Sequence, residues 1–194
     1  MEKYRIAIFA SGNGSNAEKI IQYFQDHTDI EVALVLTNNP NAGVLSRARK
    51  LSIHSIVFDR AQFAESGTIL QWLDEARITH IVLAGFLWLV PNYLIERYRN
   101  KIINIHPALL PDFGGKGMYG MKVHEAVRAA GAKETGITIH LVDEHYDNGK
   151  IVFQGRCEVT DNCSASDIAQ RVHALEYEHY AKVIEKWILE KQMD

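Results

Sequence analysis

Short apolar segments alternate with helical patterns over the first half of the chain. The apolar segments have the length of strands and cover residues 4–10, 32–36, 53–58, 81–84 and 101–105. Helices are expected in the stretches between them, over residues 16–26, 42–51, 64–76 and 91–98. Strands separated by helices in this order predict a parallel, doubly wound sheet that binds ligands at the carboxyl ends of its strands.

The pattern changes in the second half. Residues 113–120 are rich in glycine and predict a mobile loop, and residues 123–130 show the next helical pattern. Two further strands are expected at 135–142 and 151–159. Turn residues lie between these strands, which favours an antiparallel hairpin at the edge of the sheet.

A long helix follows. Ser164 is placed to cap it, and Asp167 stands at the acidic third position of a capping box. Its expected buried stripe consists of Ile168, Val172, Leu175, Val183 and Trp187. We therefore expect a single α/β domain over residues 1–194, with a doubly wound, mostly parallel sheet, an antiparallel C-terminal hairpin edge and a long C-terminal helix.

The composition is that of an ordinary globule, with 47% apolar and 23% charged residues. The formal net charge of -3 argues against a general nucleic-acid binder, which usually presents a basic face. The longest apolar run, residues 81–90, is too short to cross a bilayer. We expect no nucleic-acid partner and no membrane association.

Two cysteines, Cys157 and Cys163, have no second pair with which to form a zinc site or a disulfide framework. No signal peptide is visible before the first strand, which begins at Tyr4. A cytoplasmic location is therefore expected. Both a monomer and a homodimer are compatible with the pattern, because the last helix can cover its own sheet or a second subunit.

A glycine-rich loop, Ser11-Gly12-Asn13-Gly14-Ser15-Asn16, joins the first strand to the first helix. Its glycines let the backbone approach a ligand, and the helix behind adds free N–H groups and a positive dipole end, which suits a phosphate. With Ala17 the loop also fits a dinucleotide fingerprint, but Thr37-Asn38-Asn39 lacks the acid that would hold a ribose. A tight turn without a ligand is the plain alternative.

The fifth strand ends as Asn104-Ile105-His106-Pro107. Residues two apart on a strand face the same side, so Asn104 and His106 should share one pocket. An amide donor beside an imidazole suits chemistry that builds an oxyanion, because the amide stabilises negative charge while the imidazole moves a proton. A histidine at a strand end is also often an ordinary structural residue.

Ionisable groups crowd the turn between the last two strands, at His140, Asp143, Glu144, His145 and Asp147. A plain hairpin turn is one interpretation, since Asp147-Asn148-Gly149 is a favoured turn sequence. A carboxylate that reached His106 would favour the imidazolium and fix its orientation. The same residue types bind metals, but they match no helical two-histidine spacing, and we expect no metal.

Four segments together resemble the phosphoribosylglycinamide formyltransferase family, the folate-dependent transformylases of purine synthesis. They are Gly12 to Asn16, Leu83-Ala84-Gly85-Phe86, the run from Asn104 to Pro111, and Asp147-Asn148-Gly149. The resemblance covers essentially the whole chain in order. The Asn-x-His-Pro-x-Leu-Leu-Pro run is specific for folate-dependent formyl transfer, and the Gly-Asn-Gly-Ser-Asn loop points to the ribonucleotide member.

The resemblance implies roles for particular residues. The catalytic residues would be Asn104, His106 and Asp147. The substrate would be bound by Gly14, Ser15, Asn16, His173 and Glu176. The folate would be bound by Arg60, Leu87, Trp88, Leu89, Val90, Asn104, Asp143 and Asp147. Residues 1–100 would then form a Rossmann-like, phosphate-binding half and residues 101–194 the catalytic and folate-binding half.

The implied reaction moves the formyl group of 10-formyltetrahydrofolate, a co-substrate, to the amine of glycinamide ribonucleotide in de novo purine synthesis. Asn104 and protonated His106 would hold the oxyanion, and Asp147 would orient His106 and raise its pKa. The rival activities are formyl transfer to another phosphorylated amine, a sugar amine or a tRNA, and formyltetrahydrofolate hydrolysis. A nucleotide-binding redox protein and a non-catalytic ligand sensor are rivals of other classes.

Three features depart from the family pattern. Asn148 stands where glycine is common, and asparagine is tolerated there because it also adopts left-handed geometry. Trp88 stands where many relatives carry arginine, so stacking can replace a charge contact with the folate. The loop over residues 114–120 is longer than in many relatives, and its role is open.

Overall fold

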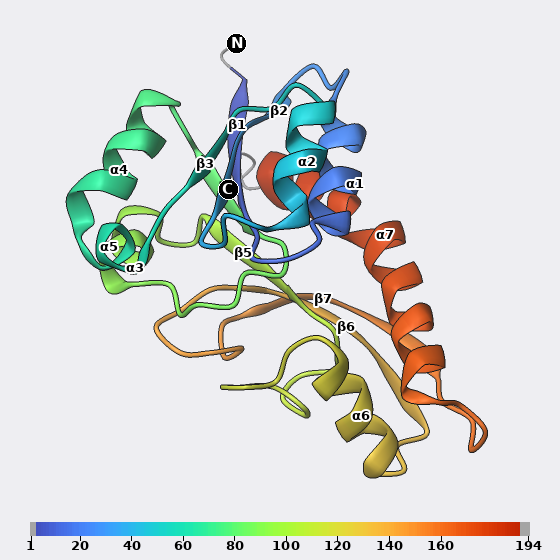
Figure 1. The fold of residues 1–194 in the computed structure, drawn as a ribbon. Coiled ribbons are helices and arrows are strands. Elements are labelled where there is room, and N and C mark those ends of the chain that lie inside the picture. The colour runs from blue at the N-terminus through green and yellow to red at the C-terminus, as the bar shows by residue number, and fades with distance from the viewer. Residues whose placement is uncertain (1–2, 191–194) are drawn as a thin grey trace.

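The computed structural model describes residues 3–190, and the strands in this range form one seven-stranded sheet in the order β3-β2-β1-β4-β5-β6-β7 (Figure 1). The strands are β1 (Tyr4–Phe9), β2 (Ile30–Thr37), β3 (Ser55–Val57), β4 (His80–Leu83), β5 (Ile102–His106), β6 (Glu134–Leu141) and β7 (Ile151–Glu158). β1 to β5 pair in parallel, whereas β6 runs antiparallel to β5 and β7. The predicted fold class is confirmed.

Helices cover both faces of this sheet (Figure 1). They are α1 (Ser15–Phe24), α2 (Gly43–Lys50), α3 (Arg60–Ala64), α4 (Ser66–Glu75), α5 (Asn92–Arg97), α6 (Met121–Ala129) and α7 (Ala165–Glu190). α1, α2 and α7 pack against one face, and α3, α4 and α5 against the other. Among the helices described, none is long and apolar enough to cross a membrane.

The two hydrophobic cores follow from the alternation of side chains along the central strands. Ile6 and Ile8 belong to one core, while Ala7 and Phe9 belong to the other, because successive side chains of a strand point to opposite faces. In β4 all four residues are buried, as expected for a strand covered on both faces. Apolar packing thus covers both faces and leaves the carboxyl ends of the strands for a site.

The helix expected over residues 64–76 is α4, and the short helix α3 that precedes it was not predicted. Asp59 caps α3 in a capping box: its carboxylate accepts from the Gln62 backbone N–H, and its own N–H donates to the Gln62 side chain, both at 2.9 Å. The backbone is extended at Glu65, which ends α3 before α4 begins. The helix predicted over residues 64–76 is therefore confirmed, and α3 is an additional element.

α7 begins as predicted, and Ile168, Val172 and Trp187 of its predicted stripe are buried. The Ser164 hydroxyl accepts from the Asp167 N–H at 3.1 Å, and the Asp167 carboxylate accepts from the Ser164 N–H at 2.8 Å. The prediction that Leu175 and Val183 are buried was wrong, since both are only partly covered. The buried side chains in the middle of the helix are four residues apart, at Val172, Glu176, Tyr180 and Ile184. An acid therefore lies within the apolar stripe.

Candidate active site

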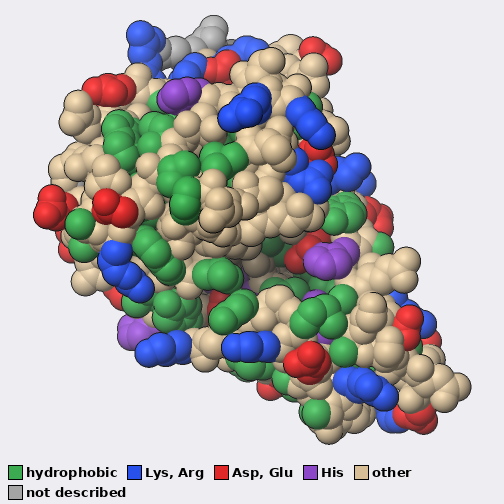
Figure 2. All heavy atoms as spheres, in the orientation of Figure 1, with side chains coloured by type: hydrophobic (Ala, Val, Ile, Leu, Met, Phe, Trp, Pro, Cys, Tyr) green, Lys and Arg blue, Asp and Glu red, His purple; other side chains and the backbone are tan. Residues whose placement is uncertain are grey.

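A cavity of about 680 Å³ lies at the carboxyl ends of β1, β4 and β5. Its walls come from the loop after β1, the segment after β4, the end of β5, the loop before α6, the β6–β7 connection and α7. Figure 2 shows this face hollowed between a larger and a smaller part of the molecule, with histidine and acidic side chains beside the hollow. This is where an open parallel sheet is expected to bind a ligand.

The glycine loop forms one wall of the cavity. Gly14 has a φ of 77°, and a Cβ added there would lie 2.5 Å from the Cβ of Val44, so a side chain is excluded on two grounds. The first hydrogen bond of α1 runs from the Glu18 N–H to the Gly14 carbonyl. The amides of Ser15 and Asn16 precede that bond, and such amides at a helix start suit an anion.

Glu176 of α7 lies beside this loop. Its carboxylate accepts from the Asn16 amide at 3.0 Å and lies 2.9 Å from Nδ1 of His173. The hydrogen bond to Glu176 raises the pKa of His173, which is half-buried. All five residues expected to bind the substrate therefore line the cavity, namely Gly14, Ser15, Asn16, His173 and Glu176.

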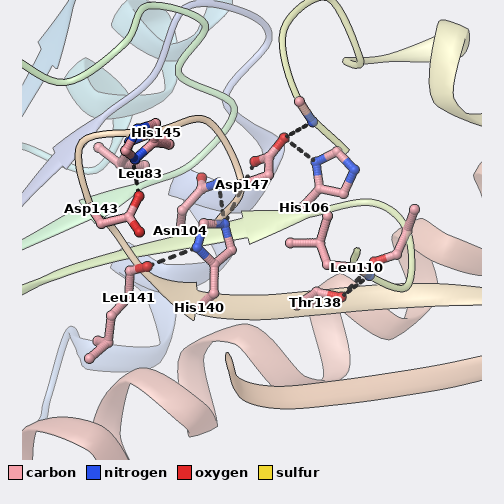
Figure 3. A network of polar contacts seen from close by, with 12 residues as sticks. Leu83, Asn104, His106, Leu110, Thr138, His140, Leu141, Asp143, His145 and Asp147 are labelled. Carbon is pink, nitrogen blue, oxygen red and sulfur yellow. Dashed lines mark hydrogen bonds and ion pairs between the residues drawn. The ribbon is translucent and has the colours of Figure 1, made fainter. Parts of the chain in front are cut away.

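His106 lies at the end of β5, between two oxygen acceptors (Figure 3). Its Nε2 is 2.8 Å from the Phe113 carbonyl, which only accepts, so Nε2 carries a proton. Its Nδ1 is 3.4 Å from Oδ2 of Asp147. That carboxylate oxygen also accepts from the Gly115 N–H at 2.9 Å. The loop before α6 is thus tied to both catalytic candidates.

Burial decides the protonation of His106. The ring is 3% exposed, and this burial lowers its pKa, while the Asp147 charge and the Phe113 carbonyl oppose that effect without reversing it. Asp147 thus acts on the His106 pKa in the expected direction, but the lowering by burial is larger. Burial also raises the pKa of Asp147, but His140, His106 and the Gly115 N–H more than offset it and lower the pKa overall.

Asn104 is connected to this pair through a histidine rather than directly. Its Nδ2 is 3.1 Å from Nε2 of His140, and the same Nε2 is 3.7 Å from Oδ1 of Asp147. Figure 3 shows the amide, the two imidazoles and the carboxylate as one connected group. The structure thus brings the three predicted catalytic residues together and adds His140.

Sequence reasoning had considered His140 only as a possible metal ligand. The pairing of β5 with β6 puts His140 next to the catalytic candidates, since Asn104 lies opposite His140 and His106 lies opposite Thr138. That pairing joins strands far apart in the sequence, and no local pattern reveals it. Among the described residues, the group within metal-binding distance of one another is instead Asp143, Glu144 and His145.

The sequence also gave no role to His124 on α6. Its side chain lines the cavity and is 2% exposed, and Nδ1 has no hydrogen-bond partner. Burial lowers its pKa, and the nearby His173 adds to that effect. The helical pattern around it could have identified a buried histidine, but not its position beside the cavity.

The residues expected to bind folate are more dispersed. Leu87 lines the cavity and is 45% exposed, but its N–H donates to the Ser11 hydroxyl and is not free for a ligand. Leu89 is exposed beyond the cavity wall, whereas the Val90 side chain is buried in the core, so a side-chain contact of Val90 with folate is excluded.

Trp88 and Arg60 lie together outside the cavity lining. The Arg60 guanidinium is 4.5 Å from the centre of the Trp88 ring, a cation–π contact between α3 and the segment after β4. Asp143 also lies outside the lining, where its carboxylate accepts from the His145 N–H and the Asn148 amide, each at 2.9 Å. A folate contact of these three residues stays a prediction.

Comparisons with known proteins agree with this geometry. The formyl transferase family matches residues 4–184. A Bacillus subtilis protein named phosphoribosylglycinamide formyltransferase is 38% identical over 94% of this chain and 93% of its own length. A chloroplastic protein of that name from Vigna unguiculata is 40% identical over 95% of this chain. This chain spans 61% of that plant relative's length.

A solved structure matches over nearly the full length of both chains. The crystal structure of phosphoribosylglycinamide formyltransferase from Bacillus halodurans has a TM-score of 0.85 and 35% identity, over 95% of each chain. The resemblance drawn from the sequence motifs is therefore confirmed. From its fold, its motifs and these relatives, the chain belongs to the phosphoribosylglycinamide formyltransferase family of formyl transferases.

Proposed function

We propose that this protein transfers the formyl group of 10-formyltetrahydrofolate to the amine of glycinamide ribonucleotide, in purine synthesis. The observation that carries the proposal is that one cavity is lined both by the glycine loop, which suits an anion, and by His106, Asp147 and Asn104. A phosphorylated amine can therefore lie with its phosphate at the loop and its reacting nitrogen at the strand end. The names of the relatives support this substrate.

The ribonucleotide is bound by complementary charge and hydrogen bonding. Its phosphate accepts hydrogen bonds from the amides at the start of α1, where the helix dipole also favours an anion. The Glu176 carboxylate, held by Asn16 and His173, accepts from hydroxyl or amine groups further along the substrate. Two substrates that are already bound in a fixed orientation lose far less translational and rotational entropy on reacting than two free ones.

The neutral amine attacks the formyl carbon, and a tetrahedral intermediate with an oxyanion forms. Asn104 donates an amide N–H to that oxygen. His106 begins neutral because burial lowers its pKa, with Nε2–H donating to Phe113. A proton released by the amine passes through His106 or water to the departing folate nitrogen, which leaves with that proton. Asp147 lies 3.4 Å from Nδ1 and stabilises the ring while it carries the proton.

The folate approaches over an apolar rim. Leu87 and Leu89, the two residues that flank Trp88 in the sequence, are 45% and 43% exposed. The Arg60 guanidinium stacked on Trp88 supplies a positive charge for the carboxylates of the folate tail. The cation thus comes from α3, although Trp88 stands where many relatives carry arginine.

The remaining assignments stay predictions. They are the absence of a metal, a cytoplasmic location, a monomeric or homodimeric state, and the division into halves at residue 100. The relatives include a bacterial and a chloroplastic protein, so the compartment of this chain needs its own measurement.

A two-substrate turnover assay tests the proposed function. Purified protein is mixed with 10-formyltetrahydrofolate, with and without glycinamide ribonucleotide, and both loss of formyl-folate and formation of formylated product are followed. We expect product to form in step with folate consumption and only when the amine is present. Folate loss without the amine would favour hydrolysis, and no turnover with this amine but turnover with another would reassign the substrate.

A further inference from the structure

His140 contacts Asn104 at the wall of the cavity. They lie directly opposite each other in the antiparallel pairing of β5 and β6, with Nε2 of His140 3.1 Å from Nδ2 of Asn104 (Figure 3). His140 is 2% exposed, whereas Asn104 is partly exposed and lines the cavity. One member of the pair can therefore touch a ligand, and the other acts behind it.

The neighbouring backbone fixes the tautomer of His140. Nδ1 lies 2.9 Å from the Leu141 carbonyl, and a carbonyl oxygen only accepts, so Nδ1 carries the proton. In the neutral ring Nε2 then carries a lone pair and can only accept a hydrogen bond. This is the atom that faces the Asn104 amide, and it requires a donor there.

The orientation of the amide follows from the tautomer. If the Asn104 amide turned over, its oxygen would face the lone pair of Nε2, and both groups would lose their hydrogen bond in a buried place. The NH₂ end is therefore held toward His140. One of its hydrogens is taken by the ring, and the second remains as the N–H that Asn104 can offer to the cavity.

We propose that His140 is a positioning residue that determines which end of the Asn104 amide is presented to the reacting oxygen. This inference rests on the proposed function, because it gives Asn104 the role of oxyanion donor. The alternative is that His140 acts through Asp147, whose Oδ1 lies 3.7 Å from the same Nε2. The two explanations differ in which residue, Asn104 or Asp147, must be present for a substitution of His140 to lower kcat.

The decisive experiment is a double-mutant cycle on kcat. We expect His140→Leu to lower kcat by about tenfold to a hundredfold, approaching the loss of a single oxyanion donor, with little change in KM for either substrate. His140→Gln, which keeps an acceptor, should recover most of the loss. In an Asn104→Ala background His140→Leu should change kcat less than twofold, whereas in an Asp147→Asn background it should keep its full effect.

Opposite results would overturn the proposal. A full additional loss from His140→Leu in the Asn104→Ala background would place its effect elsewhere, and a loss abolished by Asp147→Asn would assign it to the carboxylate. His54→Leu is the matched control, because His54 is an exposed histidine in the connection before β3. Circular dichroism and melting temperatures establish that each variant is folded.

A readout independent of turnover keeps this inference separate from the proposed function. The imidazole ¹⁵N shifts of His140 in the intact protein should show a protonated Nδ1 and a bare Nε2. The side-chain amide signals of Asn104 should move in His140→Leu but not in His54→Leu. A protonated Nε2 would refute the positioning role even in an active enzyme, whereas the expected spectra without formyl transfer would refute only the assigned reaction.

Discussion

Asp147 adopts a backbone conformation that L-residues rarely use. Its φ is 53°, and two residues later Gly149 lies so close to the Leu141 carbonyl that an added Cβ would be 1.7 Å away. Such conformations persist where the surrounding structure determines them, often at functional sites. Here the local geometry brings one carboxylate to the His106 ring, the His140 ring and the Gly115 N–H.

At the same scale, Asn104→Ala tests the oxyanion donor. Removing the amide should lower kcat by roughly a hundredfold or more, since a preorganised donor in a water-poor site stabilises the intermediate strongly. KM values should change little, because the interaction is made mainly in the transition state. Steady-state kinetics with both substrates measures this. Turnover close to that of the unmodified protein would remove Asn104 from the mechanism.

Asp147→Asn tests the link between the carboxylate and His106. The Asp147 charge opposes the lowering of the His106 pKa by burial, so its removal should lower that pKa further. If the neutral ring is the active form, the acid limb of kcat/KM should move to lower pH while the maximum rate falls. The pH–rate profiles of both proteins measure this. An unchanged limb would leave Asp147 as a turn residue.

At the scale of elements, α2 supports the anion loop from outside. The Arg47 side chain donates to the Asn13 carbonyl at 2.8 Å and pairs with Glu18 of α1, while the Val44 N–H donates to the Gly12 carbonyl at 3.2 Å. The loop is thus held by a second helix as well as by its own glycines. An anion site with a prearranged backbone binds without the cost of ordering it.

Gly14→Ala tests that arrangement. The positive φ of Gly14 and the proximity of Val44 should together cost about 1–3 kcal/mol of unfolding free energy. Because the loop must move to admit the methyl group, KM for the ribonucleotide should rise more than KM for the folate. Chemical denaturation and steady-state kinetics check the two effects, with Gly67→Ala as a control, since an added Cβ at Gly67 meets nothing within 4 Å.

Elements were predictable where their signals are local. The apolar runs located β1 to β5, and the Ser164–Asp167 capping box located the start of α7. An equally local signal, the Asp59–Gln62 box, was overlooked, and α3 was therefore missed. The role of His140 could not be read locally, because it depends on the pairing of two strands that a long connection separates.

At the scale of the whole molecule, one side chain joins the last helix to the middle of the sheet. The fully buried Tyr180 hydroxyl lies 2.8 Å from the Leu83 carbonyl, to which it donates, and 3.3 Å from that of Ile103. It therefore anchors α7 at β4 and β5. Glu176 lies one helical turn earlier on the same stripe, so its position at the cavity depends on this anchor.

Tyr180→Phe tests the anchor. Loss of the hydroxyl should lower the free energy of unfolding by about 1–2 kcal/mol, because a buried hydrogen bond is lost without a solvent replacement. KM for the ribonucleotide should rise modestly as Glu176 shifts, with kcat nearly unchanged. Denaturant titrations and kinetics measure both, and a stability equal to that of the unmodified protein would show that the hydroxyl contributes nothing to docking.

The hydrogen bond between Asn16 and Glu176 joins residues 160 positions apart. During synthesis on the ribosome, the loop after β1 therefore leaves the exit tunnel long before its carboxylate partner. A nascent chain stalled before α7 would hold the loop and the His106 strand but lack this wall. The cavity is therefore complete only once α7 has been translated.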